Sequence, residues 1–144
     1  MATDKELEIA EDMEEGEIIT RLLASSAEEV PTLTIPLQRL GIPVTLKALT
    51  GKQVSRTREH NTTTVKTKQG PKEKVDNEGF MIGLISLSTV KPNWGDPKLI
   101  EKFHASSGDE VIKRLLLGGE ISLLGEAVLD VSGYNVDLDD VKNS

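Results

Sequence analysis

Side chains that could carry out catalysis or bind a metal ion are few in this sequence, and their spacing matches no known site. The two histidines, His60 and His104, lie far apart, and neither has a partner at metal-ligand spacing. The absence of cysteine excludes a thiolate metal site, a cysteine nucleophile and a disulfide framework. No P-loop, dinucleotide-binding glycine turn or nucleophile elbow occurs, and no pattern pairs a serine with an activating base. We therefore expect no enzymatic activity, no cofactor and no metal.

The acidic run from Glu11 to Glu17 is the one stretch that suggests a calcium site. If Gly16 took the sixth position of an EF-hand loop, Met13 would take the third and Leu22 the twelfth. Both positions need oxygen ligands, which these side chains lack. The run is therefore interpreted as a solvated acidic surface rather than as a metal site.

Charge is segregated along the chain. The formal net charge of the 144 residues is −7, yet residues 1–30 contain ten acidic and two basic residues, a net charge of −8. Residues 39–74 contain nine basic and two acidic residues, a net charge of +7. The simplest interpretation is a solvated acidic segment and a solvated basic loop. In the alternative, the acidic segment screens the basic one, or both contact charged partners.

Nucleic acid is not the expected partner of the basic stretch. The stretch has no interleaved aromatic residues on which bases could stack, and the chain as a whole is acidic. No helix is expected to carry a one-sided row of arginines. A DNA-binding regulator is accordingly the least supported of the functions considered.

Alternating apolar residues predict a β-hairpin over about residues 32–49. Pro36 indicates that its first strand lies at a sheet edge. Two strands alone are only marginally stable in water, so one face of the hairpin must pack on helices. A short amphipathic helix over residues 17–24 precedes the hairpin.

A capping box predicts the helix that follows the hairpin. Thr50 and Gln53 have the T-x-x-Q spacing, and the helix should run to about His60. The basic stretch of about residues 61–75 has lysines and β-branched threonines but no apolar face. We interpret it as a flexible loop, and loops of this length inside small domains are often functional.

Residues 76–134 predict a small bundle of short helices. Capping signals mark three helix starts: Asp76 or Asn77, Asp96 with Pro97, and Ser107 with Glu110. Gly83, within an apolar stripe, permits the close approach of another helix. Gly118 and Gly119 interrupt the pattern before a last helix that should start at Glu120 and end at Gly133.

The predicted fold class is α+β and predominantly helical, with an N-terminal β-hairpin packed on a small bundle of short helices. We expect a single domain over residues 17–134, between an acidic flexible extension of residues 1–16 and an acidic flexible tail of residues 135–144. No run of about 18 apolar residues occurs, so a membrane is not an expected partner.

Several sequence blocks together carry a family resemblance: LLASSAEEVP at 22–31, RLGIPVTLKALTG at 39–51, VDNEGF at 75–80, VKPNWGDPKLIEKF at 90–103, SSGDEVIKRLLLGGEI at 106–121 and VSGY at 131–134. These blocks occur in the same order as in the XkdN-like family of phage tail assembly chaperones, found in contractile-tailed phages and related prophage elements. The chain resembles that family through them. The resemblance covers roughly residues 17–134. The ends outside that range depart from it, and it assigns no role to them.

The resemblance implies a chaperone that binds the tape measure protein and keeps it soluble and extended until the tail tube polymerises. It also implies the tail tube protein and a longer frameshifted form of the chain as further partners. The expected location is the host cell cytoplasm, with the protein absent from the mature virion. The alternative function is a structural tail component, such as a completion or baseplate adaptor protein. The family supplies no catalytic residues.

Four residues are the candidates for partner binding. Three consecutive leucines, Leu115, Leu116 and Leu117, cannot all face one side of a helix, so at least one should be exposed. Trp94 is either a lid over the small core, which we favour, or a binding anchor. Gly118 and Gly119 form a hypothetical hinge that would let the last two helices adjust around a partner.

Overall fold

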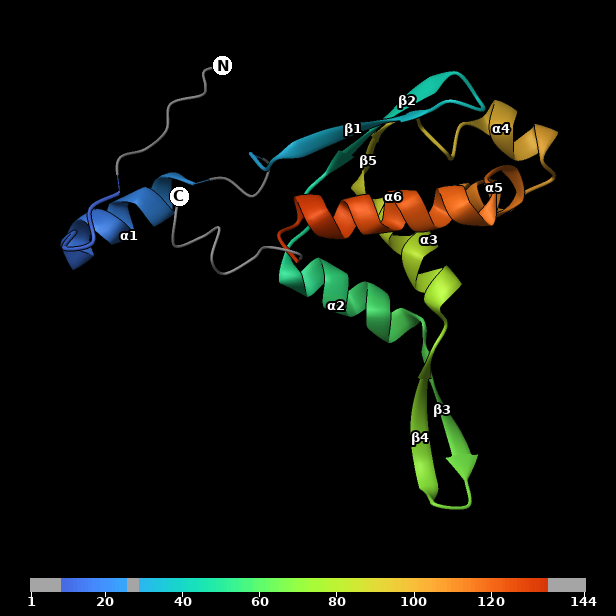
Figure 1. Ribbon diagram of the computed structural model, residues 1–144, viewed down its shortest axis with the longest axis horizontal. Coiled ribbons are helices and arrows are strands. Elements are labelled where there is room, and N and C mark those ends of the chain that lie inside the picture. Colours follow the sequence, from blue (N-terminus) through green and yellow to red (C-terminus); the bar gives the residue numbers. More distant parts are fainter. Residues whose placement is uncertain (1–8, 26–28, 135–144) are drawn as a thin grey trace. The chain divides into compact units, whose positions relative to one another are not determined.

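The computed structural model describes residues 9–25 and 29–134 (Figure 1). The chain divides into two compact units, residues 1–30 and residues 31–144. The expected flexible segment 1–16 lies partly outside the described residues, and the expected tail 135–144 lies wholly outside them.

The first unit contains α1 (Glu15–Ala24), which matches the helix expected over residues 17–24. None of its residues is buried, and its four large apolar residues are 38–80% exposed: Ile18, Ile19, Leu22 and Leu23. The single domain expected over residues 17–134 stays a prediction, while the structure divides the chain between residues 30 and 31.

The second unit has a three-stranded antiparallel sheet in the order β1-β2-β5 (Figure 1). Strands β1 (Thr32–Leu37) and β2 (Ile42–Lys47) pair along their whole length, and β5 (Thr89–Lys91) pairs with β2. β1 lies at the edge, where the proline within it loses no ladder hydrogen bond. β5 corrects the expectation that residues 76–134 are helical throughout, since three residues are too few for a periodic pattern.

A second antiparallel sheet corrects the expectation of a flexible loop over about residues 61–75. After α2 (Gly51–His60), strands β3 (Thr62–Thr67) and β4 (Gly70–Val75) pair with each other alone. Gly70 has a φ of 105°, which its lack of a Cβ permits at this tight turn. We call residues 62–75 the arm. It extends away from the helices at the point where α2 ends and α3 begins (Figure 1).

Helix α3 (Asn77–Ser88) is the central element of the second unit, and it contacts α2, α5 and α6. α4 (Pro97–Lys102), α5 (Gly108–Leu115) and α6 (Gly118–Val131) follow it in the chain. One hydrophobic core joins these helices to the first sheet through buried residues of both: Leu37, Val44, Leu46, Leu49, Val54, Phe80, Ile82, Leu84, Ile85, Trp94, Val111, Ile112, Leu116, Ile121, Leu124, Ala127 and Val128. The fold is a mixture of helices and small sheets, as expected.

The predicted helix caps are confirmed in the structure. The Gln53 amide donates to Thr50 Oγ1 at 3.2 Å, and the Thr50 amide donates to Gln53 Oε1 at 2.9 Å. Three further caps are made by the side chains of Asp76, Asp96 and Ser107. Gly133 has a φ of 90° just after α6, as a helix-ending glycine requires. The last helix differs only in its start, which lies at Gly118 rather than Glu120.

Candidate partner-binding surface

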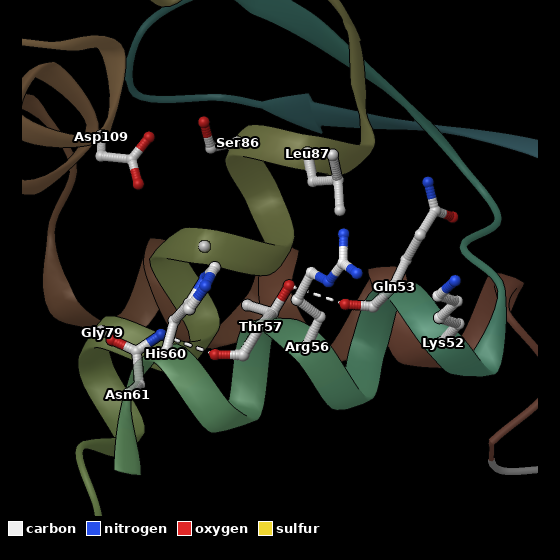
Figure 2. Close-up of a pocket in the computed structure, with 11 residues that line it drawn as sticks. Lys52, Gln53, Arg56, Thr57, His60, Asn61, Gly79, Ser86, Leu87 and Asp109 are labelled. Carbon is white, nitrogen blue, oxygen red and sulfur yellow. Dashed lines mark hydrogen bonds between the residues drawn. The ribbon is translucent and has the colours of Figure 1, made fainter. Parts of the chain in front are cut away.

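A hollow lies between α2, α3 and the start of α5. It is about 800 Å³ in volume, and we call it the α2–α3 groove. Figure 2 shows side chains of α2 along one side, with Ser86 and Leu87 of α3 and Asp109 of α5 across from them. The lining residues are Lys52, Gln53, Arg56, Thr57, His60, Asn61, Gly79, Gly83, Ser86, Leu87 and Asp109.

One wall of the groove is a basic stripe on α2. Lys52, Arg56 and His60 follow one another at steps of four residues, so they lie on one face of the helix. All three are exposed. Within residues 9–25 and 29–134, neither Lys52 nor Arg56 makes an ion pair within 4.0 Å. Their charge is therefore available to a partner.

The floor of the groove is formed where α2 and α3 cross at close range. A Cβ on Gly83 would lie 2.7 Å from Thr57 Cγ2 of α2, and a Cβ on Gly79 would overlap Asn61 Oδ1 at the end of α2. The predicted role of Gly83, to admit a neighbouring helix, is thus confirmed. No larger residue fits at either position without moving the contacting atoms.

Polar groups at the floor are already satisfied within α2. The Thr57 hydroxyl donates to the Gln53 carbonyl at 2.8 Å, and Asn61 Nδ2 donates to the Thr57 carbonyl at 2.8 Å. These side chains fix the shape of the groove. The groups that remain for a ligand are the basic stripe, Asp109 and the exposed side chain of Leu87.

Two neighbouring hollows continue the α2–α3 groove. One, of about 610 Å³, shares Asn61, Gly79 and Asp109 with it, and the other, of about 420 Å³, shares Ser86 and Asp109. The concave surface is thus longer than the first groove alone. Such an extended shape suits a chain segment better than a compact small molecule.

Of the four residues predicted to contact a partner, the structure leaves one exposed, Leu117. Trp94 is 4% exposed, and its indole Nε1 donates to Thr89 Oγ1 at 3.0 Å, so it covers the core as the favoured interpretation held. Leu116 is also buried, and Leu115 is half-buried against the core. Leu117 is 55% exposed. Trp94 and Leu116 thus lie in the core rather than on the exposed surface.

The hypothetical hinge is also placed differently. Gly118 and Gly119 are the first two residues of α6, and the joint between α5 and α6 is Leu116 and Leu117 instead. Arg39 braces this joint: its guanidinium donates to the Leu115 carbonyl at 3.1 Å and to Glu120 at 2.7 Å. A joint held from both sides is a poor hinge.

The carboxylate of Glu120 is the acceptor in the ion pair with Arg39 that stabilises this joint. Hydrogen bonds from Arg39 and from the Leu117 amide lower the pKa of Glu120 below its usual range. The same contact raises the pKa of Arg39. Both groups are thus held in their charged forms.

Sequence reasoning missed the groove and the folded arm. A signal for the groove wall was present, because Lys52, Arg56 and His60 stand four residues apart on a helix whose start was correctly predicted. The opposite wall could not be found, since it depends on how α3 and α5 pack.

No candidate metal centre competes with this surface in the part of the chain that the structure describes. Over residues 9–25 and 29–134, no group of three or more histidine, aspartate or glutamate side chains is arranged to hold a metal ion. None of the helices in the same ranges combines the length and apolar character that crossing a membrane requires.

Known proteins similar to this chain come from Bacillus subtilis strain 168. An uncharacterized protein, YqbN, is 28% identical over 105 residues, which cover 72% of this chain and 70% of YqbN. The phage-like element PBSX protein XkdN is 28% identical over 103 residues, covering 70% of each chain. A crystal structure of YqbN matches this fold with a TM-score of 0.57 and 21% identity, over 73% of this chain and 87% of that one.

A protein family matches nearly the whole sequence. The family described as "Phage XkdN-like tail assembly chaperone protein, TAC" covers residues 19–143. This match confirms the resemblance drawn from the sequence blocks, and the description names a role in assembly rather than in catalysis. The chain therefore belongs to the XkdN-like family of phage tail assembly chaperones.

Proposed function

We propose that this protein binds the tape measure protein of its phage and keeps it soluble and extended until the tail tube polymerises around it. The family match over residues 19–143 carries the proposal, because membership implies tail proteins as partners. The α2–α3 groove supports it physically. The apolar face of an amphipathic helix in the tape measure protein is exposed to water until the tail tube encloses it. A groove between two helices can bind such a face and shield it from water.

Release of the chaperone requires contacts of moderate strength. Tight interfaces are anchored by buried tryptophan, tyrosine and arginine, whereas the exposed apolar residues that line this surface are aliphatic: Leu87 and Val90. The tail tube protein is the proposed displacing partner. A longer frameshifted form of the chain is a further proposed partner, and the host cytoplasm is the proposed site of action.

Co-expression with the tape measure protein tests the binding. With an affinity tag on this chain, we expect the tape measure protein to be retained on the resin and to co-elute in size-exclusion chromatography. A tag on an unrelated acidic protein of similar size serves as the control. A folded chain that elutes alone, while the tape measure protein is insoluble, would contradict the proposal.

Mass spectrometry of purified virions separates the chaperone from a structural tail component. A chaperone that is displaced during assembly should be absent or far below the amount of the tail tube protein. Stoichiometric recovery in virions would instead favour a completion or baseplate adaptor protein.

A further inference from the structure

We propose that the α2–α3 groove is the docking site for an amphipathic helix that carries carboxylates along one flank and small or aliphatic residues along its buried face. This inference rests on the proposed function in one respect: the helix is assigned to the tape measure protein. The chemistry of the site is argued from the groove itself.

The shape of the groove favours a helix. α2 has ten residues, so its wall is about 15 Å long, close to three turns of a partner helix. The floor contains Gly79 and Gly83, and only Ser86 and Leu87 of α3 add side chains across from α2. A partner helix can therefore approach with its small or aliphatic face directed at α3.

The charges of the groove define the flank of that helix. Lys52, Arg56 and His60 are separated by about 6 Å along the axis of α2, which is the rise of four helical residues. Glutamates or aspartates at the same spacing on an adjacent helix can each lie beside one of these side chains. The basic stripe thus matches an acidic stripe turn by turn.

The wider charge distribution supports the same partner. Residues 51–75 contain seven basic and two acidic residues, a net charge of +5, although the whole chain has a net charge of −7. An acidic partner is attracted to this region and repelled elsewhere on the protein. The region therefore orients the approach of the partner.

The arm continues the basic surface from the end of α2. β3 begins two residues after His60, and β4 ends two residues before α3 begins. Its four lysines are exposed: Lys66, Lys68, Lys72 and Lys74. An isolated two-stranded hairpin without an apolar face is marginally stable, so a partner that lies along it would stabilise it as well.

A protein helix fits these observations better than nucleic acid does. No aromatic residue lines the groove on which a base could stack, and the floor consists of small residues rather than cationic ones. A second copy of this chain is the other protein candidate, and the tests below separate it from the tape measure protein.

The first test is a charge reversal with a matched control. In the complex with the tape measure protein, K52E/R56E should weaken binding about tenfold or more. K98E/K102E changes the net charge equally, at the same four-residue spacing, on exposed residues of α4 outside the groove. It should bind like the parent. Circular dichroism establishes that each variant is folded, and equal binding by both variants would overturn the inference while leaving the proposed function intact.

The second test does not need the tape measure protein. A synthetic helical peptide with glutamates at steps of four and alanine and leucine on the opposite face is titrated into the full chain, followed by amide chemical shifts in NMR. We expect shifts at Arg56, Gly83 and Leu87, which K52E/R56E reduces and K98E/K102E does not. Shifts confined to other elements, or an absence of binding, would overturn the inference.

Two further outcomes identify a different occupant. Stronger binding of a DNA duplex than of the peptide at the same amides would replace the helix with nucleic acid. A dimer in analytical ultracentrifugation that K52E/R56E dissociates would replace it with a second copy. If the peptide binds in the groove but the tape measure protein does not associate with the parent, the proposed function fails and the chemistry of the groove stands.

Discussion

Single atoms decide how closely α2 and α3 pack. A Cβ at Gly83 would overlap Thr57 Cγ2 at 2.7 Å, and Thr57 is held in place by its hydrogen bond to the Gln53 carbonyl. Neither helix can yield without moving side chains that line the groove. The floor of the groove is therefore set by one glycine and one threonine.

Replacing Gly83 with alanine should destabilise the protein. Overpacking typically costs about 1–3 kcal/mol, and the gain of about 1 kcal/mol in helix propensity offsets only part of that cost. G119A is the matched control, because nothing lies within 4 Å of a Cβ there, and it should stabilise by about 0.4–1 kcal/mol. Urea unfolding measures both free energies of unfolding, and equal changes of the same sign would argue against the close crossing.

Glu120 should make the stability of the protein sensitive to acid. Hydrogen bonds from Arg39 and the Leu117 amide lower its pKa in the folded state below the ordinary value of 4.5. Its contribution is therefore fully present above pH 4.5 and is lost as the pH falls through the lower folded-state pKa. Arg39→Met should raise the pKa of Glu120, as measured by NMR titration of its side chain. An unchanged pKa would show that Arg39 does not cause the shift.

At the scale of elements, the arm is a folded projection, and only Val75 at its base packs against the core. Its strands pair only with each other, and its side chains are exposed except near its base and at its turn. The Asp76 amide donates to the Asn61 carbonyl at 2.7 Å, so the two chain ends at its base are already neighbours. The arm is therefore separable from the fold.

Replacing residues 62–74 with a short glycine-serine turn, which keeps Val75 against the core, should leave the second unit folded. We expect a change of about 1 kcal/mol or less in its free energy of unfolding, since the shortened connection closes with little entropic cost. Binding of the acidic helical peptide should become weaker. Thermal unfolding and NMR titration measure these effects, and loss of the folded state would mean that the arm contributes to the core.

The joint between α5 and α6 should not act as a hinge. Gly118 and Gly119 lie inside the first turn of α6, and no atom approaches within 4 Å of a Cβ at either one. G118A/G119A should therefore bind the tape measure protein as strongly as the parent does. A markedly weaker complex, measured by isothermal titration calorimetry with a folded variant, would restore the hinge hypothesis.

Local signals in the sequence predicted most element starts but not the contacts between elements. The caps at Thr50, Asp76, Asp96 and Ser107 depend on side chains within a few residues, so they were readable. β5 depends on pairing with β2, a strand distant in sequence, and was not predicted. The arm was missed because its strands bury no apolar face, which removes the pattern that marks a strand.

At the scale of the whole molecule, the segregation of charge fits a partner that must be bound and later released. Exposed ion pairs are individually weak and are screened by salt. A site built from a basic stripe and a small-residue floor can therefore bind a helix with moderate affinity and release it. The chain belongs to a family of phage tail assembly chaperones, so the partner of this site is expected among the tail proteins.

Binding should consequently depend on ionic strength. Raising the salt concentration from about 0.05 to 0.5 M shortens the Debye length from about 14 to about 4 Å and should weaken the complex of the parent with the tape measure protein. K52E/R56E should show a smaller dependence, and K98E/K102E should follow the parent. Identical salt dependence in all three proteins would argue against the basic stripe as the electrostatic contact.

The soluble fraction of the tape measure protein is the most direct measurement of the central claim. It is determined after expression of the tape measure protein alone, with this chain, and with K52E/R56E. We expect the protein to be largely insoluble alone, soluble with the parent chain, and less soluble with the variant. A soluble fraction that is the same with and without the folded parent chain would contradict the role of this protein as a tape measure chaperone.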